Sequence, residues 1–178
     1  MYSIFNQLRK IAFILPLAIM LIISSCGESQ KGTDEQVATD SVAANIKMYS
    51  HVWDEIINKG NLDYFNDSNF TSDVVMHSSP TDVVGVDNAR AYYANYITGF
   101  SNITFTIKDV FGMDNKLVKH WNFKGTHSGD FFGIPATNKE VDLDGVTLVR
   151  MDHGKIAEER DFFDNLEFMQ QLGLMPRE

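Results

Sequence analysis

The strongest constraint on the fold is a change in the spacing of apolar residues near position 100. Before it, apolar side chains recur at helical steps over residues 39–57 and again over 86–98. After it, Ile103, Phe105 and Ile107 alternate with polar neighbours, which is typical of a half-buried strand. The pattern then predicts strands over 117–127, 141–151 and 155–163, and a final helix over 165–174. Helices followed by long antiparallel strands predict an α+β domain, with helices covering one face of a curved antiparallel sheet.

A curved sheet covered in this way forms a cone-shaped barrel, and aromatic residues on its inner face would line a pocket. The chain has 13 Phe, 6 Tyr and 2 Trp in 178 residues, which one domain must place in a core or a pocket. For the pocket we expect six residues, four aromatic and two basic: Trp53, Tyr96, Trp121, Phe123, Arg150 and Arg160.

The first residues have the features of an export signal. Arg9 and Lys10 precede an apolar stretch over 11–23, which as a helix would measure about 20 Å, short of the roughly 30 Å hydrocarbon core. The stretch ends in small residues before Cys26 and resembles a bacterial lipobox, in which the cysteine is acylated. An ordinary signal peptide with a chance cysteine is the alternative.

We therefore predict a signal peptide over 1–25, a flexible tether over 26–38 that begins at the lipidated Cys26, and one folded domain over 39–178. The protein would then be an exported bacterial lipoprotein, anchored to the cell membrane or the outer membrane. The sequence leaves the choice of membrane and face open.

Composition and motifs argue against several classes of function. The formal net charge of −9 disfavours nucleic-acid binding, and a single cysteine excludes an intramolecular disulfide. The chain has no glycine-rich phosphate loop, and its histidines are not spaced as metal ligands. We therefore expect no nucleotide cofactor and no metal.

The remaining candidates are polar residues at the ends of apolar strands: His77, His127, Arg150, Arg160 and Asp164. Asp164 lies close to Phe162, Phe163 and Leu166, so an inward-facing carboxylate there would be desolvated, which raises its pKa and suits it to acid–base chemistry. Asp161 has the opposite strand parity, and one sequence does not settle which of the two points inward. Satisfied histidines and surface ion pairs are the plainer interpretation.

Several segments, taken in order, resemble a known family. The most specific is Gly125–Lys139, which reads GTHSGDFFGIPATNK; DVVMH at 73–77, GKIAE at 154–158 and QQLG at 170–173 accompany it. Together they are similar to the SnoaL-like polyketide cyclase, or ester cyclase, family of the nuclear transport factor 2-like superfamily. The similarity extends from about residue 43 to 173.

The resemblance implies a conical α+β barrel with an open apolar pocket and no cofactor. It also implies that Asp164 exchanges protons with the substrate, that His127 and His77 are polar groups of the pocket, and that a homodimer can form through the exposed sheet. Many members have tryptophan four residues before the aspartate, where this chain has Arg160. The arginine makes the pocket more polar or pairs with Asp164.

Two functions stay open. The first, which we favour, is a membrane-anchored module that binds a small hydrophobic or weakly anionic molecule. The second is a cofactor-free cyclase, isomerase or hydrolase that uses Asp164 on a small carbonyl compound.

Overall fold

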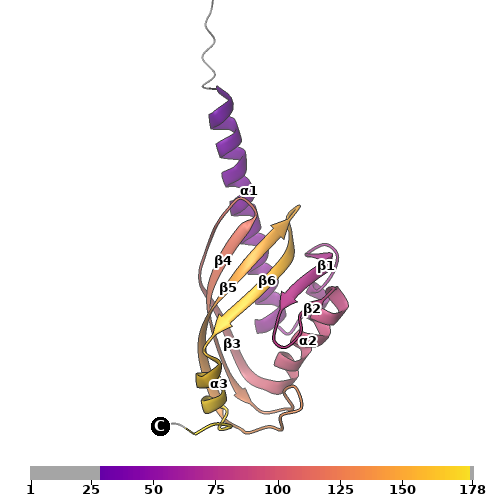
Figure 1. Ribbon diagram of the computed structural model, residues 1–178, viewed down its shortest axis with the longest axis vertical. Helices are drawn as coiled ribbons and strands as arrows, with labels where there is room; N and C mark the ends of the chain where they lie inside the picture. The colour runs from indigo at the N-terminus through magenta and orange to yellow at the C-terminus, as the bar shows by residue number, and fades with distance from the viewer. Residues whose placement is uncertain (1–28, 177–178) are drawn as a thin grey trace, which may run out of the picture.

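The computed structural model describes residues 29–176, and the predicted leader and Cys26 lie outside this range. Figure 1 shows a curved sheet with helices packed against it. The helical elements are α1 (Ser29–Trp53) with a π-helical turn η1 (Asp54–Asn58), a 3-10 turn η2 (Leu62–Tyr64), α2 (Val86–Gly99) and α3 (Asn165–Gln171). The strands are β1 (Phe70–His77), β2 (Val83–Val84), β3 (Phe100–Met113), β4 (Lys116–His127), β5 (Glu140–Asp152) and β6 (Lys155–Phe163).

The sheet has the strand order β2-β1-β6-β5-β4-β3. Strands β3 to β6 form the predicted antiparallel succession, and the turn after β3 has Asp114 in the left-handed region at φ 56°. The prediction of a wholly antiparallel sheet is wrong in one place, because β1 runs parallel to β6. The chain crosses over through α2 after β1 and β2, so β1 joins the sheet beside the last strand instead of beside β3.

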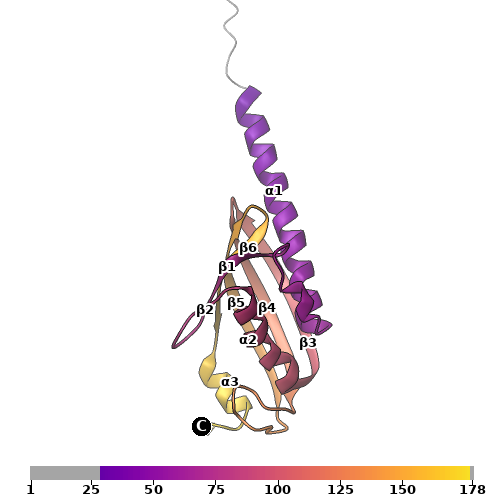
Figure 2. The same ribbon diagram turned by 90° about the vertical axis from the view of Figure 1, so that its right-hand side faces the viewer.

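Helices α1 and α2 lie on the same side of the sheet (Figure 2). They bury Tyr49, Val52 and Trp53 from α1 and Ala89 and Tyr93 from α2 against the inward-facing residues of the strands. This apolar layer is the core, and it is rich in aromatic contacts such as that of Trp53 with Tyr93, whose ring centroids lie 4.8 Å apart.

Helix α1 begins at Ser29, ten residues before the predicted start, and its first part extends beyond the sheet (Figure 1). The predicted flexible tether is therefore helical from residue 29 onward. The reason is that residues 29–38 include Gln, Lys, Glu and Ala, which favour helix, and extending an existing helix adds one hydrogen bond per residue without a new nucleation step. Within residues 29–176, no helix combines the length and the apolar character needed to cross a membrane.

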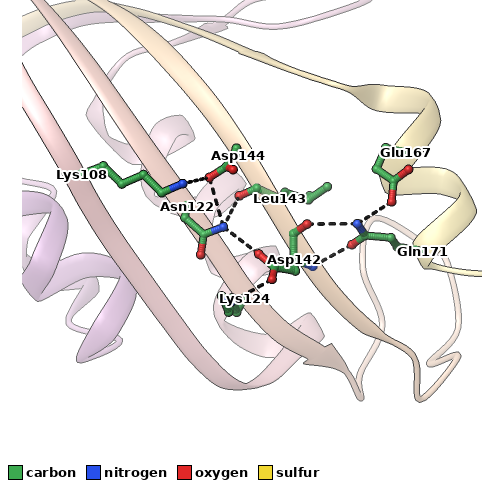
Figure 3. A network of polar contacts seen from close by, with 8 residues as sticks. All are labelled: Lys108, Asn122, Lys124, Asp142, Leu143, Asp144, Glu167 and Gln171. Carbon is green, nitrogen blue, oxygen red and sulfur yellow. Dashed lines mark hydrogen bonds and ion pairs between the residues drawn. The ribbon is translucent and has the colours of Figure 1, made fainter.

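A polar network attaches α3 to the sheet (Figure 3). The side-chain amide of Gln171 accepts a hydrogen bond from the backbone N–H of Asp142 at 2.7 Å and donates one to its carbonyl at 3.0 Å. Strand β6 pairs with β5 only as far as Gly145, so Gln171 supplies the partner that β6 no longer provides. Asn122 and Lys124 bind the Asp142 carboxylate at 2.7 and 2.8 Å. The network fixes α3 over the open end of the sheet.

Candidate functional site

An aromatic cavity lies between the inner face of the sheet and helices α1, α2 and α3. Its interior volume is about 60 Å³. Most of its lining is apolar, which suits a small apolar guest, and a lysine and an aspartate are its charged members. The lining residues are Trp53, Ile57, Tyr93, Tyr96, Phe105, Lys119, Trp121, Phe123, Leu143, Asp161, Phe163 and Phe168.

The strand register places three polar residues in one row across the inner face. Lys119 on β4 is opposite Thr147 on β5, and Thr147 is opposite Asp161 on β6. Each therefore points to the same side of the sheet as the aromatic residues two positions away. The row brings a potential base and a cation to one wall of the cavity.

The carboxylate of Asp161 is held from two sides. The Thr147 hydroxyl donates a hydrogen bond to Oδ1, and the Trp121 indole N–H donates to the Thr147 oxygen at 2.9 Å. The Tyr93 hydroxyl lies 3.5 Å from Oδ2. Thr147 is fully buried, whereas Asp161 is exposed on the open side of the cavity. The hydrogen bonds orient the carboxylate while one side stays accessible to a guest.

Lys119 is 3% exposed, and aromatic rings surround its ammonium group. Its Nζ lies 4.6 Å from the Trp53 ring centroid, 5.2 Å from that of Tyr49 and 5.3 Å from that of Phe105. Glu159 lies beneath, 2% exposed, where its Oε1 accepts hydrogen bonds from the Tyr49 hydroxyl and, at 3.0 Å, from the Trp53 indole. The floor of the cavity thus carries a buried cation and a buried carboxyl group.

Burial determines how these groups titrate. Desolvation raises the pKa of Glu159 to about 7, although Lys119 acts in the opposite direction. Desolvation lowers the pKa of Lys119, with Glu159 and Asp161 opposing the shift. Desolvation also holds the pKa values of Tyr93 and Tyr96 well above the usual range, so both phenols stay protonated at neutral pH and can donate hydrogen bonds.

A more polar space of about 350 Å³ adjoins the cavity, and we call it the vestibule. It shares Tyr93, Tyr96, Asp161 and Phe163 with the cavity, so Asp161 lies at the boundary between the two. Its other lining residues are Met76, His77, Ser78, Ser79, Tyr92, Glu159, Arg160, Phe162 and Asn165. A guest with an apolar body and a polar end would fit across this boundary.

The six residues expected to line the pocket differ in where the structure places them. Trp53, Tyr96, Trp121 and Phe123 line the cavity. Arg160 lines the vestibule but not the cavity. Arg150 belongs to neither lining, because its strand position faces away from the core and its guanidinium binds Glu158 at 2.6 Å.

The expected placement of Asp164 in the pocket needs correction. Strand β6 ends at Phe163, and Asp164 is the N-cap of α3, where its exposed carboxylate accepts a hydrogen bond from the Glu167 N–H at 3.0 Å. The inward-facing acid is Asp161, which shares the face of Glu159 and Phe163. Strand parity in the sequence does not decide between the two aspartates, and the observed register places Asp161 on the inner face.

Neither predicted histidine lies in the cavity. His127 is fully buried at the end of β4, where its Nδ1 is 3.0 Å from the Thr137 hydroxyl and its ring packs against Phe100 and Phe131. His77 lines the vestibule, with Nδ1 3.0 Å from Asp82 and Nε2 3.6 Å from Glu158. The structure does not bring either histidine together with Asp164.

Sequence reasoning missed Lys119, Thr147 and Glu159. A usable signal was present, because Lys119 has the strand parity of Leu117, Trp121 and Phe123, so a charged residue interrupts an apolar face. Buried charges on such faces are rare and mark sites with a specific role. Among residues 29–176, no group of three or more His, Cys, Asp or Glu side chains is arranged to hold a metal ion.

Comparison with known proteins agrees with this architecture. The sequence profile of the SnoaL-like polyketide cyclase family matches residues 45–172. A protein from Jannaschia sp. CCS1, named as a candidate SnoaL-like polyketide cyclase, is 25% identical, with a TM-score of 0.68 over 75% of this chain and 94% of that one. Comparison with curated proteins gave no match.

Two further solved structures share the fold. TsrD from Streptomyces laurentii is 20% identical, with a TM-score of 0.67 over 74% of this chain and 97% of that one. A nuclear transport factor 2-like protein of unknown function from Burkholderia pseudomallei is 13% identical, with a TM-score of 0.61 over 72% of this chain and 97% of that one. The family profile covers well over half of the sequence, and this chain therefore belongs to the SnoaL-like polyketide cyclase family.

Proposed function

We propose that the cavity binds a small, largely apolar carbonyl compound and that Asp161 moves a proton to or from the carbon next to its carbonyl group. The observation that carries this proposal is the position of Asp161, at the boundary of an aromatic cavity and oriented by Thr147. A carboxylate that is fixed in place and open to the guest on one side can act as a general base.

The other groups of the cavity support the same chemistry. Removing a proton next to a carbonyl places negative charge on the carbonyl oxygen, and that charge needs a cation or hydrogen-bond donors nearby. The protonated hydroxyls of Tyr93 and Tyr96 line the same cavity and can supply the hydrogen bonds. The polyketide cyclase family, whose name denotes ring closure on carbonyl compounds, is consistent with this type of substrate.

The test uses 2-tetralone, a bicyclic aromatic ketone with activated protons beside its carbonyl, as the probe. In D₂O, NMR should show the wild-type protein exchanging these protons faster than buffer. Asp161→Asn should lower the rate by about 100-fold, the size of a typical general-base contribution. Asp164→Asn is the matched control and should exchange at the wild-type rate, because Asp164 caps α3 outside the cavity.

Binding without turnover is the second candidate function. It is favoured by Arg160 and His77 in the vestibule, which can hold an anionic end of a guest without taking part in proton transfer. Both tryptophans of the chain line the cavity, so their fluorescence reports occupancy. Quenching by 2-tetralone with no exchange above the buffer rate would overturn the catalytic proposal and leave a binding protein.

We also propose that the protein is exported and held at a membrane by acylation of Cys26. The support is the lipobox-like sequence before Cys26, which lies outside the described residues, and the direction of α1. The first part of α1 extends away from the sheet, so a lipid group near its start would hold the domain at a distance from the bilayer (Figure 1).

A further inference from the structure

Lys119 has surroundings that a structural lysine seldom has. Its strand position places the side chain inside the domain, with Leu117 and Trp121 as neighbours on the same face. The side chain is 3% exposed, yet it lines the cavity, so its amine is reached from the cavity and not from bulk solvent. Besides Glu159, which accepts hydrogen bonds from Tyr49 and Trp53, the residues packed in this part of the core are mainly apolar or aromatic.

The amine also lacks a close anionic partner. Within residues 41–176, whose side chains the structure describes, no hydrogen bond and no ion pair within 4.0 Å joins Nζ to another group, and its close contacts are the faces of three aromatic rings. Glu159 and Asp161 attract it from a greater distance. A buried amine with this little solvation has its lone pair available whenever it is in the neutral form, and Lys119 lines the cavity.

The direction of the Lys119 pKa shift also favours the neutral amine. Burial lowers the pKa of Lys119, while the carboxylates of Glu159 and Asp161 oppose the shift. Glu159 itself has a pKa raised to about 7, which weakens its opposing effect wherever it is protonated. A larger fraction of Lys119 is therefore free amine near neutral pH than of an exposed lysine.

We propose that Lys119 is a nucleophile that condenses with the carbonyl carbon of an aldehyde or ketone in the cavity and forms an imine. The inference deepens the proposed function and rests on its substrate class, a carbonyl compound. The Nζ lone pair forms the N–C bond as the C=O π electrons move to oxygen, and a proton passes from nitrogen to that oxygen. The resulting hydroxyl takes a second proton and leaves as water, and the C=N bond forms.

Asp161 is placed to act on the imine once it has formed. It faces the same cavity as Lys119. The two residues lie on β6 and β4, and Thr147 on β5 lies between them, with its hydroxyl bound to Asp161. Its carboxylate can take the proton beside the iminium carbon, which is more acidic than one beside a ketone, while solvent supplies the proton that the departing hydroxyl needs. The released water leaves through the vestibule.

The experiment traps the imine in the whole chain. The protein is incubated with 2-tetralone and sodium cyanoborohydride at pH 7, and the reduced secondary amine is located by peptide mass spectrometry. Lys119 should be labelled faster than Lys124, because burial lowers the pKa of Lys119 whereas the Asp142 carboxylate raises the pKa of Lys124. Lys124 is the matched reference on the same strand, exposed and paired with Asp142 at 2.8 Å.

Two variants separate this inference from the proposed function. Lys119→Met should lose the label while 2-tetralone still quenches tryptophan fluorescence, and Asp161→Asn should keep the label while it loses proton exchange. Labelling of Lys119 no faster than Lys124, at a probe concentration that fills the cavity, would overturn the imine and leave Asp161 as a base. Fast labelling without Asp161-dependent exchange would support the imine and overturn the role of Asp161. The wild-type peptide map gives this answer even if Lys119→Met does not fold.

Discussion

Glu159 is a carboxyl group for which burial outweighs every favourable contact. It accepts hydrogen bonds from Tyr49 and Trp53 and has Lys119 nearby, yet its pKa is raised to about 7. Its Oε2 has no hydrogen-bond partner among the described residues. A charged form that lacks a partner on one oxygen is costly in an apolar core, which explains why the proton is held.

This pKa predicts how stability depends on pH. Between pH 4.5 and about 7 the unfolded chain releases the Glu159 proton while the folded chain keeps it, so folding stability falls as pH rises through this window. Glu159→Gln has no such proton and can still accept both hydrogen bonds. The unfolding free energy of the variant relative to wild type should therefore rise by up to about 3 kcal/mol from pH 4.5 to 7.

Urea unfolding at several pH values measures this difference, and the other carboxylates cancel because both proteins contain them. A difference that stays constant with pH would mean that Glu159 titrates at its ordinary value. Such a result would also weaken the argument for a free Lys119 amine, because a charged Glu159 would hold the proton on Lys119.

The residues of the site were predictable only in part. The aromatic lining follows from strand and helix periodicity, which is why Trp53, Tyr96, Trp121 and Phe123 reach the cavity. The choice between Asp161 and Asp164 depends on where β6 ends, and only Asp164 separates the end of β6 from the start of α3. An aspartate before a helix is a good N-cap. Asp164 therefore caps α3 and does not continue the alternation of β6.

At the scale of elements, β5 must leave room for the indole of Trp121 on the neighbouring strand. Gly145 is opposite both Trp121 and Phe163, and the indole lies directly over the space that a side chain at Gly145 would occupy. This placement lets Trp121 reach Thr147 with its N–H and contact Phe163 at 6.1 Å between ring centroids. The hydrogen bonds that orient Asp161 therefore depend on the absence of a side chain at Gly145.

Gly145→Ala should disturb this arrangement. The new Cβ would lie 2.2 Å from a ring carbon of Trp121, so the indole must move toward the cavity. We expect a loss of about 1–3 kcal/mol in unfolding free energy, as for other overpacked cores, and weaker quenching by 2-tetralone. Gly125→Ala on β4 is the control, because its Cβ would be 3.4 Å from Phe100. Equal effects of the two substitutions would show that Trp121 adjusts freely.

The elements themselves were predictable where local pattern sets them. Strands β4, β5 and β6 begin and end within one residue of the predicted bounds, because long alternation and clear turns define them. The parallel pairing of β1 with β6 was not predictable, since residues about 80 positions apart meet only once the whole sheet has formed. The start of α1 was missed because polar residues carry no apolar period, although they favour helix.

At the scale of the described domain, most of the cavity lining lies far from the first turn of α1. Helix α3, which contributes Phe168 to the cavity lining, lies at the end of the domain opposite the projecting part of α1 (Figure 1). The 25 residues of α1 span about 37 Å at the rise of an α-helix. Chemistry in the cavity should therefore not depend on attachment at residue 26.

Cys26→Ser tests both the anchor and this independence. In cells fed an alkyne fatty acid, the wild-type chain should be labelled and recovered with membranes, whereas Cys26→Ser should lose the label, because the serine has no thiol to acylate. Ser25→Ala is the control and should stay labelled, since it keeps a small residue before the cysteine. The purified Cys26→Ser protein should exchange the protons of 2-tetralone and label Lys119 at wild-type rates, because neither process involves the chain before α1. Persistent fatty-acid label in Cys26→Ser would contradict acylation at this cysteine, and a fall in cavity reactivity would contradict the separation of the two ends.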